Sequence, residues 1–203
     1  MKQIRLFAVF ALLLLGSSAT PRVAAAQDRA TDKTPASTAS STSNPDMQRI
    51  FEEDQKARQG PPVSPAEGKL IYQKDQTRRV QVRDLLAKGA LHTGKDFEQA
   101  AFVFQHGGGP DDYLLAHTLA IIAVARGNSG AIWIAAATLD RYLGAMKQPQ
   151  IYGTQFHKTK DTPWTQEPYN RSLISDALRD QLGVPSEAAQ QDQLESYKSA
   201  GSH

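Results

Sequence analysis

The chain has 203 residues, of which 22% are charged and none is cysteine, and its formal net charge is +2 at pH 7. The absence of cysteine excludes disulfides, cysteine nucleophiles and thiolate metal sites, so a hydrophobic core must stabilise the fold. Because Lys and Arg are scattered among Asp and Glu, the charge pattern gives no support for binding to nucleic acid or to an anionic membrane.

The N-terminus has the pattern of a secretory signal peptide. A short basic stretch at residues 2–5 precedes an apolar run at 6–15, and small residues at 24–26 form a cleavage site, with 17–19 as a second choice. An apolar run of this length is too short to span a membrane. We therefore predict a signal peptide at 1–26, export to the periplasm or the extracellular space, and no stable membrane insertion after cleavage. The alternative is an uncleaved N-terminal anchor.

A change in composition then marks the start of the folded part. Residues 27–45 are rich in Ser, Thr, Ala and Pro and contain no large apolar side chain. Such a segment cannot bury enough apolar surface to offset the entropy of ordering. We predict a disordered spacer at 27–45, a single helical domain at 46–197, and a disordered tail at 198–203.

Capping residues, prolines and glycines divide this domain into helices. Ser64 and Glu67 form a capping box, and Gly89 and Gly127 follow helical stretches. In the second helix the apolar residues lie near its two ends, so its middle is predicted to be solvated. The predicted helices are 46–58, 65–88, 96–106, 113–126, 131–146, 171–181 and 187–197.

The helices at 113–126 and 131–146 form the predicted centre of the domain. Both are apolar on nearly every face and rich in alanine, so neighbouring elements must cover both of them. They resemble the antiparallel hairpins of tetratricopeptide-like repeats. The predicted fold is therefore all-α, with antiparallel helix hairpins in a tetratricopeptide-like packing. An irregular segment follows the central hairpin from Pro149, and a short strand near 151–152 is left open.

A histidine and an aspartate interrupt this apolar hairpin. If the turn centres near residues 128–129, antiparallel pairing places His117 opposite Asp140. Burial of either polar group alone would be unfavourable, so a contact between them is expected. The pair is either a structural contact that fixes the register of the helices or a catalytic pair in which Asp140 orients His117 as a base.

Further polar residues at helix ends and in irregular chain are candidate binding residues. The histidine spacings match no metal signature, so neither a metal site nor a cofactor is predicted. The binding candidates are His106, Arg141, Gln150, Tyr152, Thr154 and Gln155.

Several short strings together resemble a bacterial family described as a domain of unknown function. They are the sequences at 105–107 (QHG), 116–117 (AH), 139–143 (LDRYL) and 149–156 (PQIYGTQF), and the family pattern is QHG…AH…DR…PQ-x-[YF]-GTQ. The similarity extends over about residues 75–185. The chain departs from the pattern at 169–170, where an aspartate is more usual, and in the Lys- and Thr-rich stretch at 157–167. The resemblance implies no established activity, but it implies that these polar residues form one constellation around His117 and Asp140.

Two function classes follow from these features. The first is an extracytoplasmic helical module that binds a protein or peptide, because no nucleophile is evident and stacked hairpins offer binding surfaces. The alternative is a small hydrolase or lyase that uses the His117–Asp140 pair, with Arg141 or His106 binding an anionic group.

Overall fold

The computed structural model describes residues 42–60, 64–159 and 161–200. The predicted signal peptide and most of the predicted spacer therefore lie outside the described residues. The all-α prediction is confirmed. The helices are α1 Pro45–Lys56, α2 Pro65–Ala87, α3 Gly94–Phe104, α4 Pro110–Ala125, the 3₁₀ turn η1 Ser129–Ala131, α5 Ile132–Ala145, α6 Asp176–Gln181 and α7 Glu187–Ala200.

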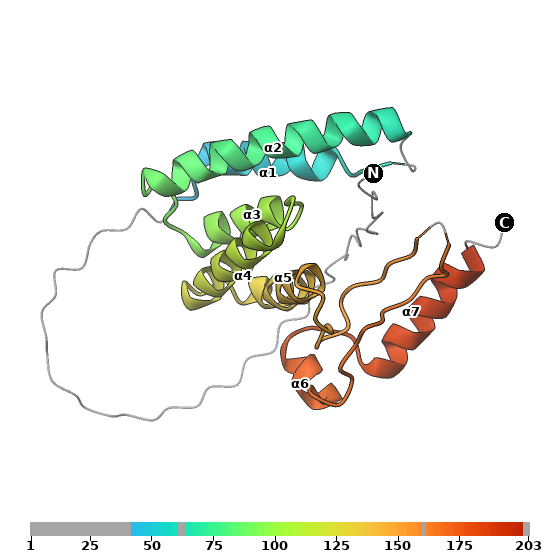
Figure 1. Ribbon diagram of the computed structural model, residues 1–203. Helices are drawn as coiled ribbons and strands as arrows, with labels where there is room; N and C mark the ends of the chain where they lie inside the picture. The colour runs from blue at the N-terminus through green and yellow to red at the C-terminus, as the bar shows by residue number, and fades with distance from the viewer. Residues whose placement is uncertain (1–41, 61–63, 160, 201–203) are drawn as a thin grey trace, which may run out of the picture.

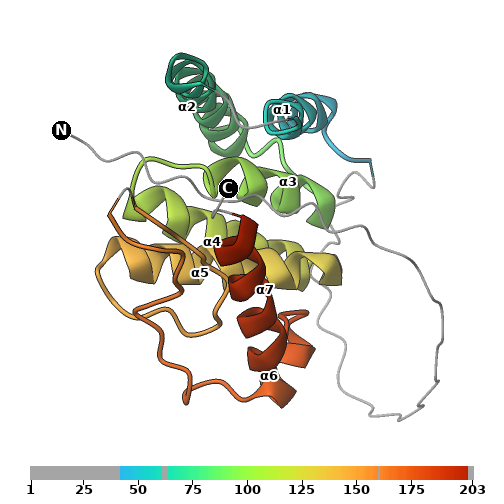
Figure 2. The same cartoon turned by 90° about the vertical axis from the view of Figure 1, so that its right-hand side faces the viewer.

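The helices form two layers and a C-terminal part. α1 and α2 lie side by side as an antiparallel pair above α3, α4 and α5, and α6 and α7 lie beyond α5 (Figures 1 and 2). In the second layer α3 packs on α4 and α4 on α5. The core between the layers is fully buried and takes side chains from all five helices, among them Met47, Ile50, Val82, Phe104, Leu119 and Ile134. One continuous core therefore joins α1 to α5, while the C-terminal part has buried apolar residues outside this core, namely Phe156, Tyr169, Val184 and Leu194.

Local signals account for most helix ends. The capping box of α2 is present, since the Ser64 hydroxyl accepts from the Glu67 amide and the Glu67 carboxylate from the Ser64 amide. Gly89 and Gly127 follow α2 and α4 with φ angles of 61° and 86°, which are unfavourable for other residues. α1 begins at Pro45 because Asn44 caps it, and the Asn44 backbone amide donates to the Asp96 carboxylate at 2.8 Å. Helix α1 therefore begins inside the range 27–45 that was predicted as spacer.

Two predicted ends in the C-terminal part differ from the structure. The helix predicted at 171–181 begins only at Asp176, because Ser175 is its N-cap and accepts a hydrogen bond from the Leu178 amide. The last helix continues to Ala200, beyond its predicted end at 197. Both differences concern short, polar segments whose helical period is weak.

The segment between α5 and α6 is irregular, as predicted. It has no strand among its described residues, only isolated bridges that pair Gln150 with Tyr169 and His157 with Thr165. Aromatic rings join it to α7: those of Phe156 and Trp164 lie 5.3 and 5.0 Å from the ring of Tyr197. In the ranges 42–60, 64–159 and 161–200, no helix combines the length and apolar character of a membrane span.

Candidate functional site

The predicted contact between His117 and Asp140 is wrong. The Nδ1 atom of His117 lies 2.9 Å from the carbonyl oxygen of Ala135, one turn before Asp140 on α5. The Asp140 carboxylate instead accepts from the amides of Ile151, Tyr152 and Thr154, at 2.8, 3.1 and 3.0 Å, and from the Thr154 hydroxyl at 2.7 Å. The catalytic pair expected between α4 and α5 therefore does not form.

The reason is that α5 is buried on two sides. Ile134 and Ala137 belong to the main core, whereas Asp140 faces the irregular segment. A turn-based register gives the depth of a residue along the hairpin, but it does not decide which of two buried faces the residue occupies. Asp140 lies at the expected depth on the other face.

Four predicted binding residues surround Asp140 but serve the loop itself. The side-chain Nε2 of Gln150 donates to the backbone carbonyl of Gln155 at 3.0 Å and to that of Gln166. Its Oε1 accepts from the backbone amide of Gln155 at 3.0 Å. Gln155 reaches the Ala137 carbonyl at 3.2 Å and the Thr154 hydroxyl at 2.9 Å. The Tyr152 carbonyl accepts from Tyr169 and Gln190. These contacts make Gln150, Tyr152, Thr154 and Gln155 the scaffold of residues 150–155.

The other two predicted binding residues, His106 and Arg141, lie in a buried charge cluster. The cluster takes side chains from α1 and the residues just after it, from α2, from the end of α3 and from α5. Its members act on one another electrostatically or through ion pairs. We define the charge cluster as Asp54, Arg58, Asp75, Arg78, His106 and Arg141.

Ion pairs between the first two helices hold the centre of the cluster together. Arg58 bridges both carboxylates, at 2.9 Å from Asp54 and 2.8 Å from Asp75. Arg78 forms a close ion pair with Asp75, and its Nε lies 3.6 Å from Asp54. The Asp54 side chain is completely buried and that of Arg78 is 6% exposed. The prediction that the middle of α2 is solvated is therefore wrong, because this face packs charged groups against α1.

A second set of ion pairs borders the cluster. Arg79 contacts Asp112 at 3.3 Å and donates to the His106 carbonyl at 3.0 Å. The exposed Arg83 holds the other oxygen of Asp112 at 2.6 Å. This contact ties α2 to the start of α4 and fixes the chain around His106.

Burial changes the protonation of the cluster. Burial, opposed by the arginines, raises the pKa of Asp54 to about 6. Burial and the charges of Arg58, Arg141 and Arg78 lower the pKa of His106 well below its ordinary value, so its imidazole is neutral at pH 7. Burial also lowers the pKa of Arg141 to about 10, which keeps it cationic at neutral pH. The neutral His106 thus lies among four guanidinium groups, those of Arg58, Arg78, Arg79 and Arg141.

Nε of Arg78 and Nε2 of His106 are buried nitrogen atoms of the cluster without a hydrogen-bond partner. The Arg78 Nε is a donor, whereas the His106 Nε2 donates or accepts according to the tautomer of the neutral ring. Nε2 of His106 lies 3.8 Å from Asp54, too far for a hydrogen bond. Buried polar atoms without partners are uncommon in folded proteins. The cluster therefore has donor capacity that its own carboxylates do not use.

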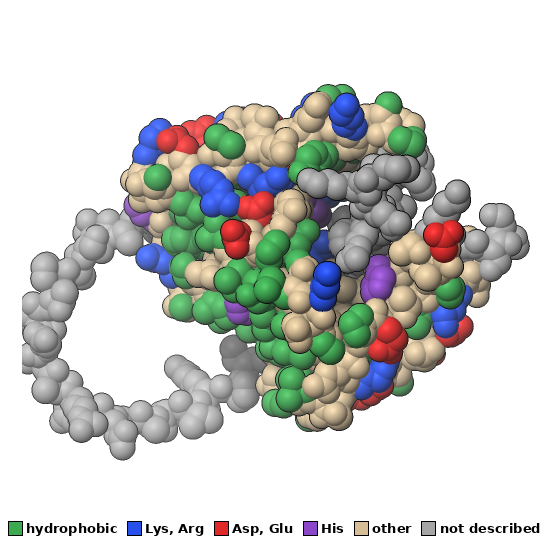
Figure 3. Space-filling model, viewed as in Figure 1, with side chains coloured by type: hydrophobic (Ala, Val, Ile, Leu, Met, Phe, Trp, Pro, Cys, Tyr) green, Lys and Arg blue, Asp and Glu red, His purple; other side chains and the backbone are tan. Residues whose placement is uncertain are grey.

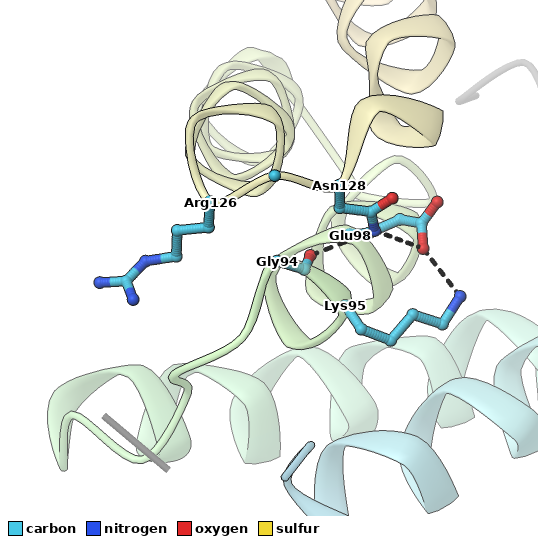
Figure 4. Close-up of a pocket in the computed structure, with 6 residues that line it drawn as sticks. Gly94, Lys95, Glu98, Arg126 and Asn128 are labelled. Carbon is cyan, nitrogen blue, oxygen red and sulfur yellow. Dashed lines mark hydrogen bonds and ion pairs between the residues drawn. The ribbon is translucent and has the colours of Figure 1, made fainter. Parts of the chain in front are cut away.

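A separate shallow hollow of about 380 Å³ lies where the start of α3 meets the turn after α4 (Figure 4). Its charged groups are bonded to the protein: Glu98 contacts Lys95 at 2.8 Å and Asn128 at 3.0 Å, and Arg126 donates to the His92 carbonyl at 2.7 Å. In Figure 4 Arg126 points away from the other two charged side chains. The hollow presents no uncommitted charged group.

No family model, curated protein or solved structure matches the chain. The family resemblance inferred from the QHG and GTQ strings thus stays a prediction. Within the described residues, no group of three or more His, Asp or Glu side chains is arranged to hold a metal ion. The assignment of the site therefore rests on geometry and charge, and on these grounds the charge cluster is the candidate site.

Four members of the cluster were not predicted from the sequence as site residues: Asp54, Arg58, Asp75 and Arg78. A signal was present, because Asp54 and Arg58 are four residues apart, while Asp75 and Arg78 are three apart, so each pair shares one helix face. Such pairs are usually solvated, and nothing in the local sequence shows that the two faces meet.

The raised pKa of Asp54 gives a prediction about the dependence of stability on pH. A carboxyl group with a folded pKa of about 6 keeps its proton in the native state, whereas in the unfolded chain it ionises near its ordinary value of 3.8. The unfolded state thus binds fewer protons between these values, and stability falls as the pH rises through that window. Relative to Asp54→Asn, the wild type should lose about 2 kcal/mol between pH 4 and 6.5 in urea unfolding.

The variant Asp176→Asn is the matched contrast. Hydrogen bonds from Glu187 and Arg179 lower the pKa of Asp176, so its contribution to stability is lost as the pH falls. The difference between wild type and Asp176→Asn should therefore have the opposite slope at and below about pH 4, and it should be nearly flat from pH 4 to 6.5. A flat difference between wild type and Asp54→Asn over this range would contradict the assignment of a raised pKa to Asp54.

Proposed function

We propose that the protein binds an oxyanion group, a phosphate or a carboxylate of a small ligand, at the charge cluster. The observation that carries this proposal is the buried Nε donor of Arg78, which has no hydrogen-bond partner and lies in one cluster with the buried, unpartnered Nε2 of His106. The sequence-based enzyme hypothesis likewise expected Arg141 or His106 to bind an anionic group.

The charges of the cluster support the same conclusion. Arg58 and Arg78 pair with Asp54 and Asp75, and the charges of Arg58, Arg78 and Arg141 all act on His106. Guanidinium groups bind phosphate and carboxylate through paired hydrogen bonds, and such charge-assisted bonds are strong. A bound oxyanion would accept from the Nε donor of Arg78 and place negative charge beside these guanidinium groups.

Titration with inorganic phosphate at constant ionic strength, followed by isothermal calorimetry, tests this proposal. The wild type should bind one phosphate saturably. Arg78→Lys keeps the charge beside Asp75 but removes the Nε donor, so it should bind phosphate at least about 10-fold more weakly. The matched control is Arg83→Lys, the same change on the same helix at a side chain that is 52% exposed, and it should bind as the wild type does.

The proposal fails if the wild type shows no saturable binding of phosphate, or if Arg78→Lys binds as tightly as Arg83→Lys. Thermal unfolding of both variants without phosphate separates loss of binding from loss of folding. The protein or peptide partner and the export expected from the sequence stay predictions. The hydrolase or lyase that depended on a contact between His117 and Asp140 is not proposed again, since that contact is absent.

A further inference from the structure

One face of α4 is apolar and exposed. Its exposed residues are Asp111, Leu114, Thr118, Ile121 and Ala125. Leu114 is 42% exposed and Ile121 is 47% exposed. The space-filling view has apolar side chains gathered over the α4–α5 region of one face (Figure 3). The hairpin was predicted to be covered on all sides, and on this face of α4 that prediction is wrong.

The exposed residues follow the spacing of a coiled-coil seam. From Asp111 to Ala125 the successive intervals are three, four, three and four residues, which is the a/d pattern by which two helices pack together. A helix that packed only within its own domain would turn such a seam inwards. On α4 the buried residues, such as Ala116, Leu119 and Ala123, form a separate face.

We propose that the exposed face of α4 binds the same face of a second copy of this chain, with the two helices antiparallel around a two-fold axis. In this register Leu114 lies opposite Ala125 of the second copy, and Thr118 lies opposite its Ile121. Each large side chain thus meets a small one, which is the shape complementarity that close helix packing needs. A parallel pair would place large residues on large ones and small on small.

The charges at the two ends of α4 favour the antiparallel arrangement. Asp111 is exposed near the start of the helix, and Arg126 is exposed directly after its end. A parallel pair would bring two copies of Asp111 together, whereas an antiparallel pair brings Asp111 of one copy near Arg126 of the other. Antiparallel helix dipoles also attract each other. The arrangement is isologous, so it closes as a dimer rather than growing into a filament.

Sedimentation equilibrium over a range of protein concentrations tests the association. The wild type should change reversibly from monomer to dimer, and Ile121→Glu should remain monomeric at concentrations where the wild type is mostly dimeric. The matched control is Val80→Glu on α2, where an apolar side chain that is 67% exposed lies outside the seam, and it should dimerise as the wild type does. Circular dichroism checks that both variants keep their helix content.

Disulfide trapping tests the direction of the helices, because the chain has no cysteine of its own. An equal mixture of Thr118→Cys and Ile121→Cys should form the mixed disulfide faster than either variant forms its own dimer. Faster self-linkage of Thr118→Cys would show a parallel pair and overturn the proposal. A wild type that stays monomeric at every concentration would also overturn the proposed dimer. Neither result bears on phosphate binding at the charge cluster.

Discussion

Replacement of Asp75 by alanine is expected to lower the free energy of unfolding by about 3–5 kcal/mol. Asp75 contacts Arg58 at 2.8 Å and Arg78 at a closer distance, and all three side chains are at least 89% buried. Without this carboxylate, two guanidinium groups stay in the interface between α1 and α2 with only Asp54 to balance them. A buried charge that loses its partner is strongly destabilising because water does not replace the lost interaction.

The control for this variant lies on the same helix. Asp84→Ala also removes an aspartate that forms an ion pair, with Lys88 at 2.6 Å, but both of those side chains are more than half exposed. Exposed pairs contribute about 0–1 kcal/mol, so this variant should unfold at nearly the wild-type urea concentration. Equal destabilisation by Asp75→Ala and Asp84→Ala would mean that the charge cluster is solvated. That result would contradict the proposal that a buried cluster binds an anion.

The features that local chemistry determines could be predicted from the sequence. The capping box of Ser64 and Glu67 and the glycines after α2 and α4 lie where the sequence placed them. Each depends on hydrogen bonds or dihedral angles within a few residues, so nothing distant in the chain can change the outcome. Helix content and the central hairpin follow from the same local rules and from the apolar pattern.

The charge cluster could not be predicted in this way. Asp75, Arg78 and Arg79 are charged and helical, and charged residues on a helix are usually solvated. Asp75 and Arg78 meet their opposite charges on Arg58 and Asp54, which come from α1 and the residues just after it. Arg79 meets its opposite charge on Asp112, at the start of α4. The exposed apolar residues of α2, Leu70 and Val80, show the same effect, since packing against α1 decides which face of the helix is covered.

Of the constellation expected from the sequence, His106 and Arg141 lie in the charge cluster, whereas His117 and Asp140 lie outside it. His117 and Asp140 were joined on the assumption that both face the interior of one hairpin. The structure separates them because Asp140 is recruited by the backbone amides of residues 151–154. Helical periodicity does not predict a contact between a carboxylate on a helix and the backbone amides of an irregular segment.

Replacement of Asp140 by alanine should therefore destabilise the protein far more than replacement of His117. Three backbone amides, those of Ile151, Tyr152 and Thr154, and one hydroxyl would lose their acceptor. Each buried donor left unsatisfied costs about 1–3 kcal/mol, and some of them will find water, so we expect a total loss of about 3–5 kcal/mol in urea unfolding. The bridge between Gln150 and Tyr169 and the packing of α7 should loosen with the loop.

His117→Ala is the matched comparison within the same hairpin. His117 makes one hydrogen bond, to the Ala135 carbonyl at 2.9 Å, so its removal should cost about 1 kcal/mol. Because the two side chains do not touch, the double variant should lose the sum of the two single losses to within about 0.5 kcal/mol. A coupling energy of 2 kcal/mol or more would show that His117 and Asp140 interact after all, and would restore the paired arrangement that the hydrogen bonds of the 151–154 loop argue against.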